Sequence, residues 1–195
     1  MIKPDPPRTC PCPIAFVGEA PGAEEEADGH FWVGPAGRLL THLMRAADID
    51  RADHLLTNVF AERLPGDKVE NWCGTTKEAK VWARESGYSL PAVKRGKWLR
   101  PEHAWHLKRL AGELEAAKPT ILVPLGGTAL WALLGTSEIM QHRGAAALST
   151  QTYPLTKMLP TLHPAYLFHA WKFFATLVAD LIKAEREATF PELRF

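Results

Sequence analysis

Short apolar runs that alternate with helical patterns constrain the fold of this chain more than any other feature. Residues 13–18, 54–60 and 121–126 are short, mostly apolar runs, which is typical of buried strands, and the first and third end in a turn-forming Gly. Alternation of these runs with helices predicts the α/β class, as a three-layer α/β/α sandwich with a mostly parallel central sheet. Helices are expected at 35–47, 101–117 and 127–134.

The remaining segments predict less regular elements. Residues 19–34 hold three Gly and five acidic residues without a usable period, so we expect a loop there. Two short strands are expected at 143–148 and 157–162. The last helix is expected after Pro164, where apolar residues recur at helical spacing: Leu167, Trp171, Phe174, Leu177, Val178 and Leu181.

Composition sets the class of protein. The 195 residues, 46% of them apolar, suffice for one domain with a sizeable core. Lys and Arg number 23 against 22 for Asp and Glu, so any contact to nucleic acid must come from local patches. The first residues lack the apolar core of a secretory signal, and no stretch reaches about 18 apolar residues. We expect a soluble, cytoplasmic monomer that has no membrane partner.

Residues 62–100 interrupt the alternation, and we expect them to form an insertion within a single domain that spans residues 1–195. A helix is expected near 76–86 inside it. Four tryptophans crowd into this part of the chain: Trp72, Trp82, Trp98 and Trp105. They either fill the core of the insertion, or one or two of them stack on nucleic acid. In the second case basic residues nearby bind phosphates: Lys94, Arg95, Lys97 and Arg100.

Three polar motifs follow three of the predicted strands. Gly18 and Glu19 end the first strand, Asn58 lies late in the second, and His163 follows the last. Ligands of parallel sheets bind outside the carboxyl ends of the strands, so these motifs are expected to meet. A buried Asn58 amide offers one acceptor and two donors, enough to read a pyrimidine edge. The three adjacent carboxylates at 24–26 repel one another, so one of them can have a raised pKa or a specific task.

Together the motifs resemble a known family. In this order they resemble the uracil-DNA glycosylase superfamily, most closely its iron–sulfur (family 4) branch and that branch's cross-linking relative. The resemblance covers roughly 18–60 and 101–185. It implies an enzyme of the glycosylase-like sandwich fold that hydrolyses the N-glycosidic bond of uracil, or a related base, in DNA and leaves an abasic site. The motifs are GEAPGAEEEADGHFWVGPAGRLL (18–40), TNVF (57–60), LGGTALWALLG (125–135), HRG (142–144) and LHPAYL (162–167).

The resemblance implies how the base is bound. The backbone around Gly18, Glu19 and Ala20 would contact the flipped base. Trp32 would stack on it, at a position where the family usually carries Phe. Asn58 would hydrogen-bond the O4 and N3–H edge of uracil. These five residues form the expected substrate-binding set.

The resemblance also implies the chemistry, in which Asn58 and His163 take part. His163 would donate a hydrogen bond to O2 while negative charge develops on the leaving uracil. Glu25, with Glu26 as the next candidate, would position the attacking water. A preorganised donor aimed at such an oxygen contributes on the order of 3–4 kcal/mol. The motifs place no lysine for Schiff-base chemistry, so we expect a monofunctional hydrolase.

DNA contacts follow from the same comparison. Arg143 and Gly144 would contact a backbone phosphate, and Tyr166, Leu167 and Phe168 lie where the family inserts a wedge into the duplex. Basic residues of the insertion are further candidates: Lys94, Arg95 and Lys97.

The cysteines depart from the family pattern. The iron–sulfur branch uses four Cys, whereas this chain has three, and Cys10 and Cys12 are spaced C-x-C. No Cys follows the TNVF motif closely, and His106 stands where a later ligand is expected. We therefore expect free thiols and no cofactor. The alternative is a metal or iron–sulfur site on Cys10, Cys12, Cys73 and His106.

Three other functions remain open. Trp32 in place of Phe reshapes the base pocket, which favours a glycosylase for another modified base. A non-catalytic DNA-binding module is a second possibility, although Asn58 and His163 together argue against it. A third is cross-linking to DNA through His103 or His106, but the insertion does not match the loop of the cross-linking relatives.

Overall fold

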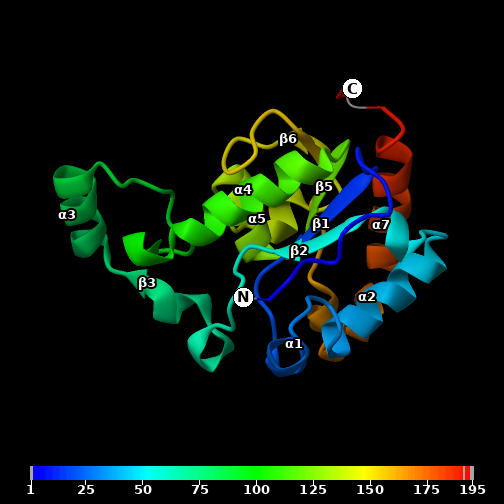
Figure 1. Cartoon of the computed structure of the whole chain (residues 1–195), viewed down its shortest axis with the longest axis horizontal. Coiled ribbons are helices and arrows are strands. Elements are labelled where there is room, and N and C mark those ends of the chain that lie inside the picture. Colours follow the sequence, from blue (N-terminus) through cyan, green and yellow to red (C-terminus); the bar gives the residue numbers. More distant parts are fainter. Residues whose placement is uncertain (1, 191, 194–195) are drawn as a thin grey trace.

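The computed structural model describes residues 2–190 and 192–193, and its centre is a five-stranded sheet in the order β2-β1-β5-β7-β6 (Figure 1). β1 pairs in parallel with β2 and with β5, and β5 pairs in parallel with β7. β6 joins the edge antiparallel to β7. The prediction of a mostly parallel sheet is confirmed. The strands are β1 (Ile14–Gly18), β2 (Leu55–Asn58), β5 (Ile121–Pro124), β6 (Ala147–Leu148) and β7 (Lys157–Met158).

Helices cover both faces of this sheet. Alternate residues of β1 point to opposite faces: Phe16 joins a buried cluster with Leu40 and Leu177, whereas Val17 joins a second one with Leu110 and Leu130. The two clusters correspond to the two helical layers seen in Figure 1, and the expected three-layer sandwich is confirmed. The layers are α2 (Pro35–Ala46) with α7 (Phe174–Glu187), and α4 (Trp105–Ala117) with α5 (Gly127–Leu134).

The segment at 19–34 differs from the expected loop, because it contains the short helix α1 (Ala23–Asp28). The Glu25 carboxylate accepts a hydrogen bond from the backbone N–H of Gly22 and so closes the first turn. Gly29, with a φ of 86°, ends the helix in the left-handed conformation. A helix of six residues is too short to produce a visible sequence period.

The last helix begins later than predicted. Two 3₁₀ helices, Pro164–Phe168 and Trp171–Phe173, precede α7, and Ala170 between them has a non-helical φ of −145°. Leu167 and Trp171 therefore lie outside the α-helix that their spacing suggested. The strands expected at 143–148 and 157–162 shrink to two residues each, and the short helix α6 (Ile139–His142), which was not predicted, lies before them.

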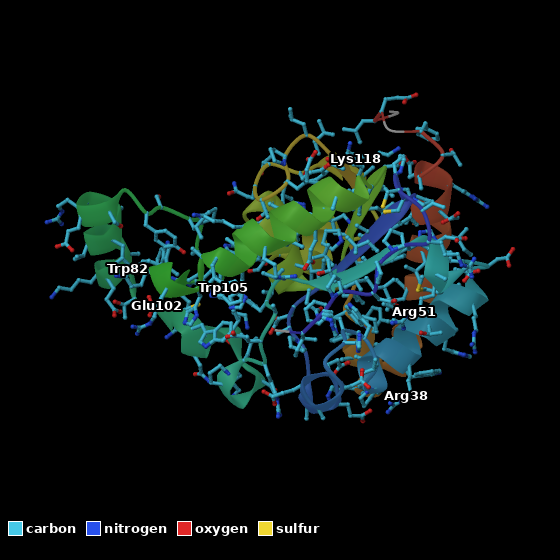
Figure 2. All side chains as sticks on the ribbon, viewed as in Figure 1. Arg38, Arg51, Trp82, Glu102, Trp105 and Lys118 are labelled. Atoms are coloured by element: carbon cyan, nitrogen blue, oxygen red, sulfur yellow. The ribbon has the colours of Figure 1, made fainter. Side chains whose placement is uncertain are left out.

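The insertion projects from the sheet and carries α3 (Thr76–Ser86), in agreement with the helix predicted near 76–86 (Figure 1). β3 (Cys73–Gly74) and β4 (Trp98–Leu99) pair antiparallel at its base. Figure 2 shows Trp82 on this arm and Trp105 at the start of α4.

Ring stacking joins the insertion to α4. The ring of Trp72 lies 4.3 Å from that of His103 and 5.1 Å from that of His106, and the Trp105 ring lies 3.7 Å from His106. The Trp82 ring contacts Gly74 so closely that an added Cβ would lie 2.4 Å from it. These tryptophans face other protein groups, which favours the core-filling interpretation over contact with nucleic acid. None of the helices in the described part of the chain is long and apolar enough to cross a membrane.

Candidate active site

A cavity of about 460 Å³ lies outside the carboxyl ends of β1, β2 and β5. It brings together residues from all three polar motifs, as the sheet topology predicts. A larger cavity of about 810 Å³ lies next to residues 5–8 and 45–52, but two ion pairs on its wall, Arg51 with Asp5 and Arg8 with Asp50, already engage four of its charged side chains. We therefore place the candidate site in the smaller cavity. The predicted residues that line it are Glu19, Ala20, Glu25, Trp32, Asn58 and His163.

Gly18 lets two of these side chains meet at the end of β1. A Cβ at this position would lie 2.3 Å from the Asn58 Oδ1 and 2.4 Å from Cζ2 of Trp32. Any larger residue would push the amide or the indole away. Gly18 thus shapes the pocket without lining it.

Trp32 is fixed against the pocket wall. Its Nε1–H donates to the Thr57 carbonyl oxygen at 3.1 Å, and its ring stacks on the His163 imidazole at 5.5 Å with 28° between the planes. The backbone of Trp32 is left-handed, with a φ of 63°. Its carbonyl oxygen lies so close to Gly37 that an added Cβ there would be 1.9 Å away, so α2 needs glycine at this contact. Trp32 is 4% exposed, and its indole forms one side of the cavity.

The Asn58 side chain has an unused acceptor. It is 3% exposed, and its Oδ1 has no hydrogen-bond partner among the described residues. Leaving such an atom unpaired costs about 1–3 kcal/mol. Because the side chain lines the cavity, an N–H group of a ligand can supply the missing donor.

His163 is arranged as a neutral donor. Its Nδ1 accepts the backbone N–H of Ala165 at 3.2 Å, so in the neutral ring the proton lies on Nε2. Burial lowers the pKa of His163 to about 4. The imidazole is therefore uncharged at neutral pH and offers one N–H to the cavity.

Glu19 brings a carboxyl group to the cavity that the sequence analysis did not use, because it assigned only the backbone of this residue to the base. The Glu19 Oε2 accepts from Oγ1 of Thr128 at 2.5 Å, and burial raises the pKa of the carboxyl group. The sequence feature that could have indicated this role is the position of an acidic residue directly after the buried strand β1.

Glu25 is the one carboxylate of the acidic run at 24–26 that is buried, with 7% exposure. Its two oxygens accept backbone N–H groups of Gly22 at 3.1 Å and of Gly34 at 2.8 Å, so it ties the two ends of the loop together. Glu26 instead lies on the surface, 3.6 Å from Arg63. The structure thus places Glu25 beside the cavity in a role that also holds the loop.

Apart from Phe168, the predicted DNA contacts lie outside the cavity, and their side chains differ in exposure. The Arg143 Nη2 donates to both carboxylate oxygens of Asp180, at 2.8 and 2.7 Å, and the neighbouring Gly144 has a φ of 70°. Leu167 is 2% exposed, so Tyr166 and Phe168 are the side chains that this segment presents, and Phe168 also reaches the cavity. Three cations of the insertion are exposed: Lys94, Arg95 and Lys97. Lys94 pairs with Glu70 at 2.5 Å.

The two buried cysteines and His106 each make separate contacts with the backbone. Cys12 and Cys73 are buried, each donates to a nearby backbone carbonyl, and Cys10 is exposed. Burial raises the pKa of both buried thiols, that of Cys73 to about 11, which disfavours the ligating thiolate. The His106 Nδ1 accepts the N–H of Ala61. In residues 2–190 and 192–193 no group of three or more His, Cys, Asp or Glu is placed to hold a metal ion.

Comparison with known proteins agrees with this geometry. Residues 7–183 match the family model of the uracil DNA glycosylase superfamily. The type-4 uracil-DNA glycosylase of Thermotoga maritima is 30% identical over 159 residues, which cover 79% of this chain and 65% of the relative. Those of Archaeoglobus fulgidus and Pyrobaculum aerophilum are 44% and 41% identical, over 28% and 30% of this chain and equal shares of their own. The chain thus spans slightly less than two thirds of the length of the first relative and belongs to the uracil DNA glycosylase superfamily.

Proposed function

We propose that this chain is a monofunctional DNA glycosylase that hydrolyses the N-glycosidic bond of uracil in DNA and leaves an abasic site. The observation that carries the proposal is the pairing of an unused acceptor with a neutral donor in one cavity, Asn58 Oδ1 and His163 Nε2–H. A uracil edge complements both, because N3–H is a donor and O2 is an acceptor. The Asn58 amide N–H groups then serve O4.

The donor acts on the leaving base. As the N-glycosidic bond breaks, its electron pair moves onto uracil and negative charge develops at O2. The Nε2–H of the neutral His163 imidazole donates a hydrogen bond to O2 and so stabilises that charge. The imidazole does not have to change its protonation state beforehand. A fixed donor of this kind contributes on the order of 3–4 kcal/mol to the transition state. The base must leave the DNA stack to reach the pocket, which costs a few kcal/mol and favours weakly paired bases.

Two carboxyl groups are candidates for the other half of the reaction. An ionised carboxylate near C1′ stabilises the positive charge on the sugar and takes the proton of the attacking water. Glu25 lines the cavity, and both of its oxygens accept backbone N–H groups. Glu19 faces the same cavity. Glu25→Gln and Glu19→Gln, measured in parallel, separate the two: the variant that loses the larger part of its excision rate identifies the acting carboxylate.

A different target base is the second candidate, and the position of Trp32 favours it. The indole fills one wall of the cavity where the family usually has a smaller phenyl ring, so the space for the base differs. A panel of oligonucleotides that each contain one deaminated or modified base measures the preference. Uracil released fastest supports the main proposal, and another base released faster supports this one.

Cross-linking through the insertion receives less support. His106 is fully buried with its Nδ1 bonded to the Ala61 N–H, and the His103 ring stacks on Trp72. Neither imidazole lines the cavity. A covalent complex that survives denaturation, and that disappears in His103→Ala, would revive this alternative.

We further propose that DNA is the partner, that the chain acts as a monomer, and that it needs no iron–sulfur cluster, because its cysteines and His106 are not gathered at one site. Iron analysis and visible absorption of the protein purified without oxygen test the last point. Stoichiometric iron with charge-transfer absorption contradicts it. We also retain the expectation that the protein is cytoplasmic.

Base release tests the proposed function. Oligonucleotides with one uracil, single-stranded or opposite G or A, are incubated with the protein and then cleaved at abasic sites by alkali. The proposal predicts cleavage at uracil by the wild type and very little by His163→Ala. A non-catalytic DNA-binding module would bind these oligonucleotides and release no base.

A further inference from the structure

Exposed aromatic side chains gather next to the pocket. Among the described residues, the aromatic side chains that are large and exposed all lie within 166–171: Tyr166 is 44% exposed, Phe168 55% and Trp171 58%. Elsewhere in the described chain the aromatic rings are buried or half-buried. Apolar surface concentrated in this way marks a site of interaction.

Two of these rings, those of Tyr166 and Trp171, pack against other aromatic side chains. The Trp171 ring stacks on that of Phe174, with centroids 5.1 Å apart and 25° between the planes, and the Tyr166 ring leans on Phe173 at 5.5 Å. Buried Leu167 anchors the first 3₁₀ helix between the exposed residues. Because the rings are already ordered, little conformational freedom is lost when a flat partner stacks on them.

The aromatic segment continues the wall of the candidate active site. His163 caps the 3₁₀ helix Pro164–Phe168, and Phe168 at its far end lines the same cavity. The second 3₁₀ helix, which begins with Trp171, contacts the first. A nucleotide chain that delivers one base to the cavity from this side passes beside these rings.

The charge of this region suits a polyanion. From 166 to 179 the sequence contains no Asp or Glu and includes the exposed Lys172, whereas Arg143 is paired with Asp180 and the acidic run at 24–26 lies on α1. The Lys172 Nζ lies 5.5 Å from the centre of the Phe173 ring. Phosphates on the aromatic side of the pocket thus avoid the carboxylates of α1.

We propose that Phe168 and Trp171 form a stacking platform for unpaired nucleobases that flank the target nucleotide, so that single-stranded DNA is the substrate form that this surface binds. The inference rests on the proposed function and adds the form of the substrate to it. Bases in a duplex stack on one another and do not present their faces, whereas bases of a single strand are free to stack on side chains. Such stacking is sequence-tolerant, because every base has a π-face.

Binding of DNA without uracil tests the platform independently of catalysis. The affinity of the full chain for a labelled oligothymidine and for a duplex of equal length is measured by fluorescence anisotropy. Trp171→Ala is expected to weaken single-strand binding about 5- to 100-fold, the range seen when one base loses its stacking partner. Phe168→Ala is expected to act in the same direction, and duplex binding is expected to change less than about 3-fold in each variant.

Two variants control for unrelated effects. Trp171→Phe keeps an aromatic face and is expected to retain most of the single-strand affinity. Leu155→Ala removes an 82% exposed apolar side chain outside the aromatic segment and is expected to change nothing. Thermal unfolding of Trp171→Ala shows whether removal of the ring that packs on Phe174 unfolds the segment. If it does, the single-strand affinities of Trp171→Phe and Phe168→Ala decide whether the platform exists.

The outcomes separate this inference from the proposed function. Loss of affinity confined to single strands supports the platform even if no uracil is released. Equal loss on duplex and single strand overturns it in favour of a wedge that enters the duplex. Unchanged single-strand affinity in both alanine variants, or no single-strand binding by the wild type, also overturns it, while uracil release by the same samples leaves the glycosylase proposal standing.

Discussion

Aromatic side chains gather in two regions of this molecule and differ in what they face. In the insertion, Trp72 is 8% exposed and stacks on the imidazoles of His103 and His106. In the segment after the candidate active site, Phe168 and Trp171 are more than half exposed. The density of aromatic residues in the sequence therefore points to a core in the first region. Exposure beside the candidate active-site cavity points to a ligand surface in the second.

The largest effect is expected at the cavity itself. His163→Ala removes the donor to O2 and should lower the single-turnover rate of uracil release by about 10²–10³-fold. DNA affinity should change little, because the phosphates are bound elsewhere. Quench-flow or manual sampling with alkaline cleavage measures the rate. An unchanged rate would remove His163 from the catalytic role.

Trp72→Ala should lower the stability and leave the activity unchanged, which is the reverse of the effect expected for His163→Ala. Loss of a buried indole from the interface between the insertion and α4 should lower the free energy of unfolding by about 3 kcal/mol. The protein that remains folded should release uracil at the wild-type rate. Urea denaturation combined with activity of the folded fraction checks both points. If DNA affinity fell while stability held, the insertion tryptophans would face nucleic acid after all.

Acid should destabilise the protein through both regions, at His106 beside the insertion and at His163 in the candidate active site. Only the change at His163 should also affect activity. Burial lowers the pKa of His163 and of His106 from 6.5 to about 4, so between these values the unfolded chain binds protons that the folded chain does not. The contribution that each neutral imidazole makes to the free energy of unfolding is complete above pH 6.5 and is lost as the pH falls toward 4. Each should account for up to about 2 kcal/mol of the loss between pH 7 and pH 5.

Denaturant titrations at both pH values test this. His163→Gln and His106→Phe should each flatten the dependence of stability on pH, and only the first should also slow uracil release. Equal slopes in both variants and in the wild type would mean that the two imidazoles are already protonated in the folded protein at pH 5.

The smallest effect is expected at the exposed cations of the insertion, Lys94, Arg95 and Lys97. Replacing these cations should flatten the salt dependence of single-strand binding, by about 0.7 in log–log slope for each phosphate that is no longer neutralised. A matched control removes three exposed cations of α3 and should leave the slope unchanged. Identical slopes in both variants would limit the insertion to a structural role. The test variant is Lys94→Ala, Arg95→Ala and Lys97→Ala, and the control is Lys77→Ala, Lys80→Ala and Arg84→Ala.

The sequence predicted the parts of the fold that depend on local pattern. The parallel strands and the meeting of Asn58 with His163 follow from apolar runs and from the geometry of parallel sheets. The helix α1 was missed, because it depends on a hydrogen bond from the Gly22 N–H to the Glu25 carboxylate rather than on a period. The break before α7 was missed for a similar reason, since the non-helical backbone at Ala170 leaves no mark in residue spacing.

The other features that the sequence did not predict depend on contacts between residues far apart in the chain. Arg143 meets Asp180 across 37 positions, so its internal ion pair is invisible in the HRG motif. The Glu19 carboxyl group reaches Thr128 in α5 across 109 positions. Exposure of Trp171 follows only once the segment is known to be a 3₁₀ helix rather than part of α7. Each of these features needs the tertiary structure.

The central claim is that Asn58 reads the N3–H of uracil while His163 stabilises the leaving base. Single-turnover release from single-stranded oligonucleotides that carry uracil or N3-methyluracil tests it most directly, with the wild type and Asn58→Ala in parallel. The account predicts that the wild type releases uracil and that N3-methylation slows it strongly. In Asn58→Ala the same methyl group should matter much less, because no acceptor remains to be blocked. Equal penalties in both proteins, or no uracil release by the wild type, would contradict it.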